Sequence, residues 1–401
     1  MKNFKKLLSL ALVTALALTT VACGGGSESA DSTSDSEASS DAATDEETFK
    51  IGGIGPTTGG AAIYGLAVKN GAQIAIDEIN EAGGINGVQI EYNFQDDEHD
   101  TEKAVNAYNT LKDWGMELLL GTVTSAPSTA VAPEAANDGY YMLTPSGSSP
   151  AIIEGKTNVF QVCFSDPNQG TGAAQYIGSK KLATKVAVIY DSSDVYSSGI
   201  FEKFSAEAAN QSFEIVAAEA FTADTKTDFS VQLQKAKEAG AELVFLPIYA
   251  QEASLILTQA AGMDFAPRFF GCDGLDGVLA VENFDASLAE GVILLTPFVA
   301  DAEDEKTTSF VTKYQELYTD IPNQFAADAY DGVYIIKAAI EKSGATPDMS
   351  AADMGAAVIG AMTEITFDGL TGTGMTWEAT GEVSKEPKAM EIKDGVYVTF
   401  E

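Results

Sequence analysis

The sequence predicts an α/β protein with two similar units, each built on a parallel sheet. Short apolar runs alternate with longer segments whose apolar residues recur about every 3.6 positions, which is the pattern of strands followed by helices. The alternation begins at residue 49 and restarts near residue 160. A strand–helix–strand succession favours a parallel sheet covered by helices on both faces. Two such units suggest a cleft between them, where small-molecule sites tend to lie.

The first unit opens with the apolar run FKIGGIG at residues 49–55, which we expect to be a strand. A helix at 62–81 should end at Gly83 and Gly84, because glycine is common just after a helix. Ser125, Ala126 and Pro127 offer a hydroxyl cap and an early proline for a later helix. The remaining expected elements are a strand at 88–94, a helix at 101–114 and strands at 118–120 and 140–143.

The second unit repeats this pattern. Helices are expected at 169–180, 196–210, 227–239 and 251–262, with strands at 185–190, 213–220, 243–246, 268–272 and 292–295. Three more helices are expected at 303–318, 325–343 and 350–362, followed by β structure at 375–377 and 389–400.

Composition limits the possible functions. The 401 residues include 59 acidic and 23 basic ones, giving a net charge of −36. Nucleic acid binding requires clustered lysine and arginine, so we exclude it. The hydrophobic fraction of 45% is enough for a packed core in each unit.

The N-terminus is typical of an exported protein. Residues 1–22 combine lysines, an apolar stretch too short to span a bilayer and a small residue at the end, as in a signal peptide. Cys23 follows directly and resembles the lipidated cysteine of bacterial lipoproteins, although an ordinary signal peptide with an incidental cysteine is the alternative. Residues 23–48 contain no large apolar side chain after the cysteine, so we expect a disordered acidic tether.

Two neighbouring strands end in turns rich in hydroxyl groups and glycine. The strand at 118–120 leads to the helix start at Ser125, and the strand at 140–143 leads to the turn 144–149. Ligands of parallel sheets bind beyond the carboxyl ends of the strands, and free N–H groups at helix starts favour anions. These turns therefore predict a corner that binds a carboxylate.

Motifs for enzyme chemistry are scarce. The run GGIGPTTGG has Thr58 where a dinucleotide fingerprint needs its third glycine, and the nucleotide-binding P-loop and the nucleophile elbow are missing from the sequence. The only histidine, His99, lies among acidic residues and could be a metal ligand, but we favour a solvated acidic turn that caps the next helix. We expect no enzymatic activity, no cofactor and no metal.

Cys163 and Cys272 are the cysteines of the folded part. They could pair in an exported protein, but each lies in an apolar run typical of a buried strand. We therefore favour two free, packed thiols.

Several stretches, taken in order, resemble the leucine/isoleucine/valine-binding proteins that serve ABC importers. They are FKIGGIGPTTGGAAIYG, NGAQIAIDEINEAGGING, GTVTSAPSTAVAPEAANDGYYMLTPSGSSP, CFSDPNQGTGAAQYI, KVAVIYDSSDVYSSG and FDGLTGTGMTWEATGE. The resemblance covers residues 49–401 and implies a type I periplasmic-binding-protein fold, with two Rossmann-like lobes joined by a three-strand hinge. The implied first lobe is 49–164 plus 297–374, and the second is 165–296 plus 375–401.

The resemblance also implies a ligand site. Ser125, Ser146 and Ser148 match the positions that hold a ligand carboxylate, and Asp273 matches the acidic residue that pairs with its ammonium group, where the family commonly has Glu. The full implied set is Tyr64, Val123, Thr124, Ser125, Ser146, Gly147, Ser148, Tyr196, Tyr249, Asp273 and Phe325.

The implied function is capture of an amino acid, branched-chain or otherwise apolar, by hinge closure. The implied partners are the ABC permease and the membrane that holds the lipid anchor, and we expect a monomer on the extracellular or periplasmic face. The alternatives are a protein of the same fold that binds an amide, urea or aromatic acid, a sensory ligand-binding domain, and a dehydrogenase-like enzyme. The broken glycine fingerprint and the single histidine argue against the last one.

Overall fold

The computed structural model describes residues 47–400. The helices are α1 (Ala62–Glu81), α2 (Thr101–Trp114), α3 (Ser125–Asp138), α4 (Asp166–Ser179), α5 (Val195–Ala208), α6 (Ser230–Glu238), α7 (Ala250–Gly262), α8 (Glu305–Tyr318), α9 (Gln324–Ser343) and α10 (Ala351–Met362). The strands are β1 (Phe49–Gly55), β2 (Ile90–Asp96), β3 (Leu118–Gly121), β4 (Tyr141–Thr144), β5 (Val159–Gln161), β6 (Lys185–Asp191), β7 (Glu214–Phe221), β8 (Leu243–Leu246), β9 (Arg268–Gly271), β10 (Ile293–Thr296), β11 (Lys388–Lys393) and β12 (Val396–Thr399).

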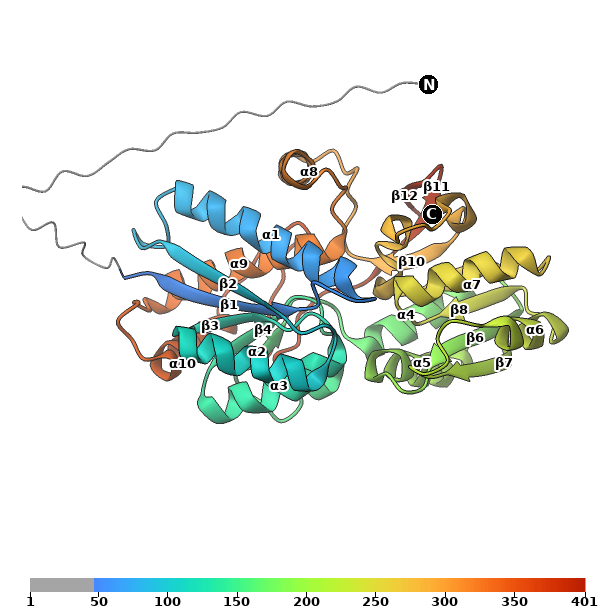
Figure 1. Ribbon diagram of the computed structural model, residues 1–401, viewed down its shortest axis with the longest axis horizontal. Coiled ribbons are helices and arrows are strands. Elements are labelled where there is room, and N and C mark those ends of the chain that lie inside the picture. Colours follow the sequence, from blue (N-terminus) through green and yellow to red (C-terminus); the bar gives the residue numbers. More distant parts are fainter. Residues whose placement is uncertain (1–46, 401) are drawn as a thin grey trace, which may run out of the picture. The chain divides into compact units, whose positions relative to one another are not determined.

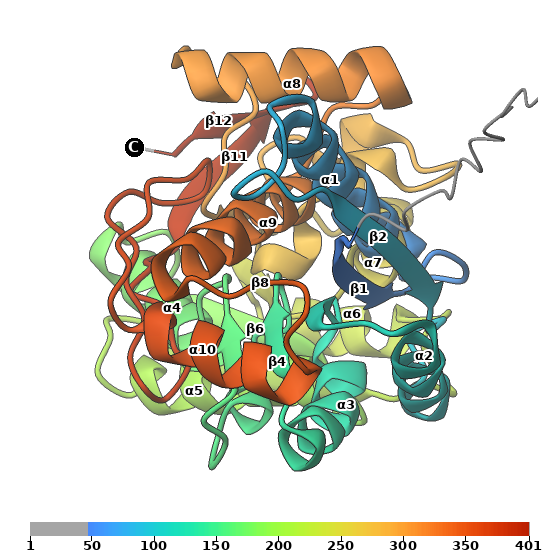
Figure 2. The same cartoon turned by 90° about the vertical axis from the view of Figure 1, so that its left-hand side faces the viewer.

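The first lobe is built on a five-stranded parallel sheet of order β2-β1-β3-β4-β5. Its central strands are apolar on both faces, and Leu118 and Leu120 pack with α1, α9 and α10, whereas Leu119 packs with α2 and α3. This is the expected consequence of strands covered by helices on both sides. Figures 1 and 2 show α1 and α9 on one side of this sheet, with α2 and α3 on the other.

The second lobe is built on a seven-stranded sheet of order β12-β11-β10-β9-β8-β6-β7. The strands β6 to β10 are parallel to their neighbours, whereas β11 and β12 add an antiparallel edge. Helices α4 and α5 cover one face and α6 and α7 cover the other. The predicted α/β class with two parallel-sheet lobes is therefore confirmed, with an antiparallel addition at the C-terminus.

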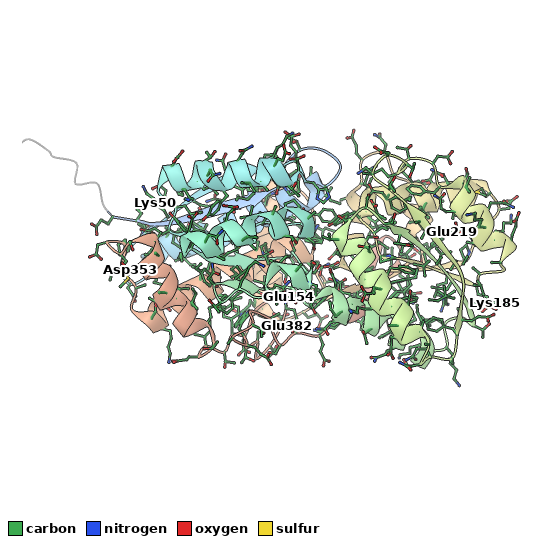
Figure 3. All side chains as sticks on the ribbon, turned by 90° about the horizontal axis from the view of Figure 1, so that it is seen from below. Lys50, Glu154, Lys185, Glu219, Asp353 and Glu382 are labelled. Carbon is green, nitrogen blue, oxygen red and sulfur yellow. The ribbon has the colours of Figure 1, made fainter. Side chains whose placement is uncertain are left out.

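The chain passes between the two sheets three times, after β5, after β10 and after α10. The crossings are irregular segments rather than the expected hinge strands, because their backbone groups form isolated bridges and single bonds instead of ladders. Two side-chain hydrogen bonds also hold the crossings. Ser165 Oγ of the first crossing donates to Glu382 Oε1 of the third at 2.9 Å, and Trp377 Nε1 of the third donates to the Gln161 carbonyl of β5 at 2.8 Å. Figure 3 labels Glu382 of the third crossing and Glu154 of the first lobe.

The predicted helices are all present, with ends that differ by up to three residues. The start of α3 differs from the prediction, because the N-cap residue is Thr124 rather than Ser125. The Thr124 side chain forms no capping hydrogen bond within residues 47–400. The Thr124 hydroxyl instead contacts the His99 ring, with 2.8 Å between Oγ1 and Nδ1. The predicted β segment at 375–377 forms only bridges.

Cys163 and Cys272 are buried, free thiols, as expected. The predicted signal peptide at 1–22, the lipidated Cys23 and nearly all of the tether at 23–48 lie outside the described residues. Within residues 47–400, no helix is both long and apolar enough to cross a membrane.

Candidate functional site

A small cavity lies where the two lobes meet. Its lining comes from the carboxyl ends of strands and the starts of helices in both lobes, as expected for parallel sheets. The lining residues are Tyr64, Val123, Thr124, Ser125, Ser146, Ser148, Tyr196, Tyr249, Asp273, Gly274 and Phe325. The structure thus brings together all of the predicted site residues except Gly147.

Gly147 faces away from the cavity. A side-chain carbon added at this position would lie 2.6 Å from Ser128 Oγ and 2.7 Å from Thr144 Oγ1, inside the first lobe. Its backbone N–H donates to Thr144 Oγ1 at 2.8 Å, which holds the serine turn against the end of β4. Gly147 is thus not part of the cavity lining in this structure, because close packing sets its place in the turn.

Gly274 lines the cavity and was not predicted. Its N–H donates to the Tyr196 hydroxyl at 2.9 Å, and its carbonyl accepts from Tyr64 Oη at 2.6 Å. A side-chain carbon here would lie 2.7 Å from Tyr196 Oη and from the Ile248 carbonyl. The only signal in the sequence was its place beside Asp273.

The first-lobe end of the cavity is rich in hydroxyl groups and backbone N–H groups. Ser125 is the first residue of α3, and its Oγ accepts from the N–H groups of Ser148 and Ser149, each at 3.3 Å. Ser146 Oγ donates to the Val123 carbonyl at 2.7 Å, which ties the two turns together. The first N–H groups of a helix have no partner within the helix. This end of the cavity therefore suits an anionic group.

The second-lobe end carries a buried carboxyl group. Asp273 follows β9, is 3% exposed, and accepts from Tyr196 Oη at 2.6 Å. Burial raises the pKa of Asp273 to about 7, against hydrogen bonds from Tyr196 and Gln169 that lower it. A cation placed beside this carboxyl group would favour its ionised form. The first-lobe end of the cavity thus suits an anionic group, whereas the second-lobe end suits a cationic group.

Four aromatic rings form the remaining wall. Tyr64 lies 4.7 Å from Phe325 and 5.4 Å from Tyr249 between ring centroids, and Tyr249 stacks on Tyr196 at 4.9 Å. Tyr64 and Phe325 belong to the first lobe, whereas Tyr196 and Tyr249 belong to the second. Such a wall fits an apolar group and excludes water from it.

Direct hydrogen bonds also join the lobes around the cavity. Tyr64 Oη accepts from the Ala250 N–H at 2.7 Å, and Gln324 Nε2 donates to the Asp273 carbonyl at 3.0 Å. The N–H of Gln324 donates to Asp276 Oδ2 at 2.9 Å. These bonds describe lobes that are closed on each other.

The acidic turn around His99 was predicted to be solvated and to cap the next helix, and the structure agrees with this only in part. Asp100 caps α2 by accepting from the Lys103 N–H at 2.9 Å, as expected. Asp97 is fully buried, however, and His99 is only 27% exposed, with Nε2 4.0 Å from Asp194 Oδ2. Within residues 47–400, no group of three His, Cys, Asp or Glu side chains could hold a metal ion.

A larger groove runs between α4 and the third crossing. It is open to solvent, and acidic residues such as Glu378, Glu382 and Glu386 line it. The small cavity is the better site candidate, because it is closed by both lobes and its polar groups converge.

Residues 48–396 match the family model of the periplasmic binding proteins. The chain belongs to this family. It is 30% identical over 299 residues to a leucine-, isoleucine-, valine-, threonine- and alanine-binding protein from Pseudomonas aeruginosa, covering 74% of this chain and 79% of the relative. The family comprises binding proteins, which confirms the expectation that this periplasmic binding protein is not an enzyme.

Two solved structures extend the comparison. The branched-chain amino acid transporter substrate-binding protein LivJ from Streptococcus pneumoniae, in complex with isoleucine, is 30% identical with a TM-score of 0.79, covering 88% of this chain and 100% of LivJ. A solute-binding protein of an ABC transporter from R. palustris, in complex with benzoate, is 20% identical with a TM-score of 0.78, covering 88% and 95%. The similarity to the benzoate-binding protein shows the fold alone. Both bear out the type I two-lobed architecture, and LivJ together with the Pseudomonas relative bears out the predicted resemblance.

Proposed function

We propose that this periplasmic binding protein captures an amino acid, branched-chain or otherwise apolar, for an ABC importer. One observation carries the proposal: the interlobe cavity has an anion-binding end on the first lobe and a buried carboxyl group, Asp273, on the second. An α-amino acid carries complementary groups at the corresponding ends. The relatives named for leucine, isoleucine and valine support the same class of ligand.

Both charged ends of the ligand are needed for useful affinity. Burying a leucine-sized side chain against Tyr64, Tyr249 and Phe325 contributes only ~1.5–3 kcal/mol. Micromolar binding requires about 8 kcal/mol. Charge-assisted hydrogen bonds to Ser125 with its neighbouring N–H groups, and to Asp273, supply the difference in a closed site.

Closure of the lobes couples capture to delivery. The ligand contacts both lobes, so it binds the closed form better and shifts the population toward it. The bonds of Tyr64 and Gln324 to the second lobe form only when the lobes are closed. The closed protein then presents one matched surface to the permease.

We also propose that the protein is held at the outer face of the membrane through lipidated Cys23 and the acidic tether up to residue 48. The support is the sequence pattern of a signal peptide followed directly by a cysteine. Two or more acyl chains are sufficient for stable anchoring. Metabolic labelling with a radioactive fatty acid tests this, since a Cys23→Ala variant should carry no label.

An aromatic acid is the second candidate ligand, favoured by the benzoate complex of the same fold. Benzoate offers a carboxylate for the serine turns but no ammonium group for Asp273. The two candidates therefore differ in whether removal of the Asp273 carboxylate weakens binding.

Calorimetric and thermal-shift titration of the purified chain against the twenty amino acids, simple amides and benzoates tests the proposal. We expect saturable binding of leucine, isoleucine or valine with one ligand per chain. Binding of benzoates or amides with no response to any amino acid would overturn it.

A further inference from the structure

The only histidine of the chain lies where the two lobes meet. His99 belongs to the first lobe, in the turn between β2 and α2. Its Nε2 atom lies 4.0 Å from Asp194 Oδ2, and its ring meets the Tyr249 ring edge to face, with 5.4 Å between centroids. Asp194 and Tyr249 are the N-cap residues of α5 and α7 in the second lobe. These two contacts therefore form when the lobes close and are lost when the lobes separate.

The first lobe alone holds the His99 ring in its place. His99 and Glu98 both have left-handed backbone angles, with φ of 61° and 50°, which residues other than glycine rarely adopt. The Asp97 and Asp96 carboxylates accept from the N–H groups of His99 and Glu98 at 2.8 and 2.9 Å. The ring Nδ1 lies 2.8 Å from Thr124 Oγ1. The ring is thus positioned before the second lobe reaches it.

Charged groups from both lobes surround the ring. They are Asp97 and Asp100 on the first lobe, and Asp191, Asp194, Lys226 and Glu252 on the second. Lys226 Nζ lies 3.2 Å from Glu252 Oε1, so these two charges largely offset each other at the ring. The remaining carboxyl groups attract a protonated ring, whereas burial between the lobes disfavours it. The effect of a proton on closure depends on which of these is larger.

The carboxyl groups nearest to the ring attract a proton on it only weakly. A separation of 4.0 Å from Asp194 is too long for a hydrogen bond, and this carboxylate already accepts from the Ser197 N–H at 3.0 Å. Burial raises the pKa of Asp194 to about 6 and that of Asp97 to about 7. Both groups are therefore partly protonated in the pH range where a histidine titrates.

Burial consequently decides the sign. It lowers the pKa of His99 in these closed lobes, and Lys226 lowers it too, whereas Glu252, Asp191 and Asp100 raise it without reversing the direction. In separated lobes the ring loses its second-lobe neighbours and regains an ordinary histidine pKa of about 6.5. A lower pKa in the closed state means that the neutral ring favours closure. This contribution is complete above about pH 6.5 and is lost as the pH falls below that value.

We propose that His99 is a proton-sensitive contact between the lobes: the lobes close on the neutral ring, and protonation of the ring favours the open protein. The inference goes beyond the proposed function, and it rests on that function only through the coupling of ligand binding to closure. Acid then releases the ligand through two separate groups, His99 and the proposed ligand contact Asp273.

NMR measures the protonation of His99 directly. Histidine-selective isotope labelling gives one set of imidazole signals, because the chain has one histidine. Titration with and without saturating L-leucine yields the pKa of His99 in both states, and we expect the lower pKa in the leucine-bound state. An equal or higher pKa with leucine bound overturns the inference. A chain that binds no amino acid overturns the proposed function and this inference with it, and calorimetry recognises that case by the absence of binding heat.

Two substitutions test whether the contact depends on closure. Asp194 caps α5 in the second lobe, and Asp100 caps α2 in the first lobe. Asparagine caps a helix about as well as aspartate, so both variants should fold. Asp194→Asn should lower the pKa of His99 only in the leucine-bound state, whereas Asp100→Asn, the matched control, should lower it in both states. An equal change in both states for Asp194→Asn overturns the inference.

The affinity for L-leucine provides an independent check. His99→Asn removes the titrating group and leaves an amide that can form a hydrogen bond with Thr124. Between pH 8.5 and 5.5 the loss of affinity should be smaller in His99→Asn than in the unaltered chain, because only Asp273 still responds. A pKa difference of one between the two states corresponds to an about tenfold change in affinity, so the NMR values set the size of the effect. Equal losses in both chains overturn the inference, and if His99→Asn fails to fold, the NMR comparison decides.

Discussion

The hydroxyl of Tyr64 lies 2.6 Å from the carbonyl oxygen of Gly274, and the two residues belong to different lobes, 210 positions apart in the chain. The same hydroxyl accepts from the Ala250 N–H at 2.7 Å. Tyr64 is thus a bridge between the first lobe and two separate turns of the second. Because Gly274 directly follows Asp273, this bridge and the proposed ammonium site share one turn.

Removal of the Tyr64 hydroxyl should weaken the closed state. Tyr64→Phe leaves a buried carbonyl and a buried N–H without their partner, at a cost of roughly 1–3 kcal/mol. We expect ligand affinity to fall by about five- to a hundredfold. Calorimetry measures the affinity, and small-angle scattering should show a more open ligand-free protein. Tyr92→Phe is the control, since the buried Tyr92 hydroxyl has no hydrogen-bond partner within residues 47–400 and Tyr92 does not line the cavity. Equal affinities in both variants would show that the bridge does not contribute to closure.

Asp273 should dominate recognition of the ligand's amino group. Asp273→Ala removes the buried carboxylate and should weaken amino-acid binding tenfold or more, because a charge-assisted hydrogen bond of about 1.5–3 kcal/mol is lost. Titration calorimetry with L-leucine measures the change. An unchanged affinity for L-leucine would remove Asp273 from the site.

The affinity for an amino acid should depend on pH in a defined direction. Burial raises the pKa of Asp273 to about 7, so its carboxyl group is increasingly protonated below that pH in the ligand-free protein. The ammonium group binds the ionised form, and protons therefore compete with the ligand. Between pH 7 and 5 the affinity should fall by up to about tenfold per pH unit for one such group. Titrations at pH 5.5, 7 and 8.5 check this, and a flat profile, or a rise in acid, would contradict it.

The hinge region depends on a buried ion pair. Lys385 Nζ lies 2.8 Å from Asp328 Oδ1, with only 2% and 1% of these side chains exposed, and it donates to Thr371 Oγ1 at 2.6 Å. Lys385→Met leaves the Asp328 charge uncompensated and should lower the free energy of unfolding by roughly 3–5 kcal/mol. Urea unfolding measures this value.

The matched surface pair is Lys203 and Glu202, which are 44% and 73% exposed. Lys203→Met should change the free energy of unfolding by less than about 0.5 kcal/mol. A Lys385→Met variant as stable as this control would show that the buried pair contributes nothing to the fold.

The fold was largely predictable because its local signals agree with its tertiary structure. Strands such as 118–120 and 243–246 are buried on both faces, so their sequences are continuous apolar runs bounded by glycine or polar residues. Where two neighbouring residues carry similar side chains, the signal is ambiguous. Thr124 and Ser125 both carry a hydroxyl that could cap a helix. In the structure Thr124 occupies the N-cap position, and its hydroxyl contacts His99 of another element instead of capping α3.

The site was predictable to the extent that its residues follow strands at one edge of a sheet. Serines after β3 and β4 meet for this reason, and the resemblance to a known family supplied the second-lobe residues. The sequence does not show that Gly274 lines the cavity and Gly147 does not. This difference arises from tertiary packing, which places Gly147 inside the first lobe and Gly274 at the cavity.

The central claim is that one amino acid spans the cavity, with its carboxylate on the first lobe and its ammonium group on the second. A crystal structure of the chain with bound L-leucine tests this most directly. We predict carboxylate oxygens within hydrogen-bond distance of Ser125 and the N–H groups of the serine turn, and the ammonium nitrogen within about 3 Å of an Asp273 oxygen. A ligand bound in the reverse orientation, or outside this cavity, would contradict the account.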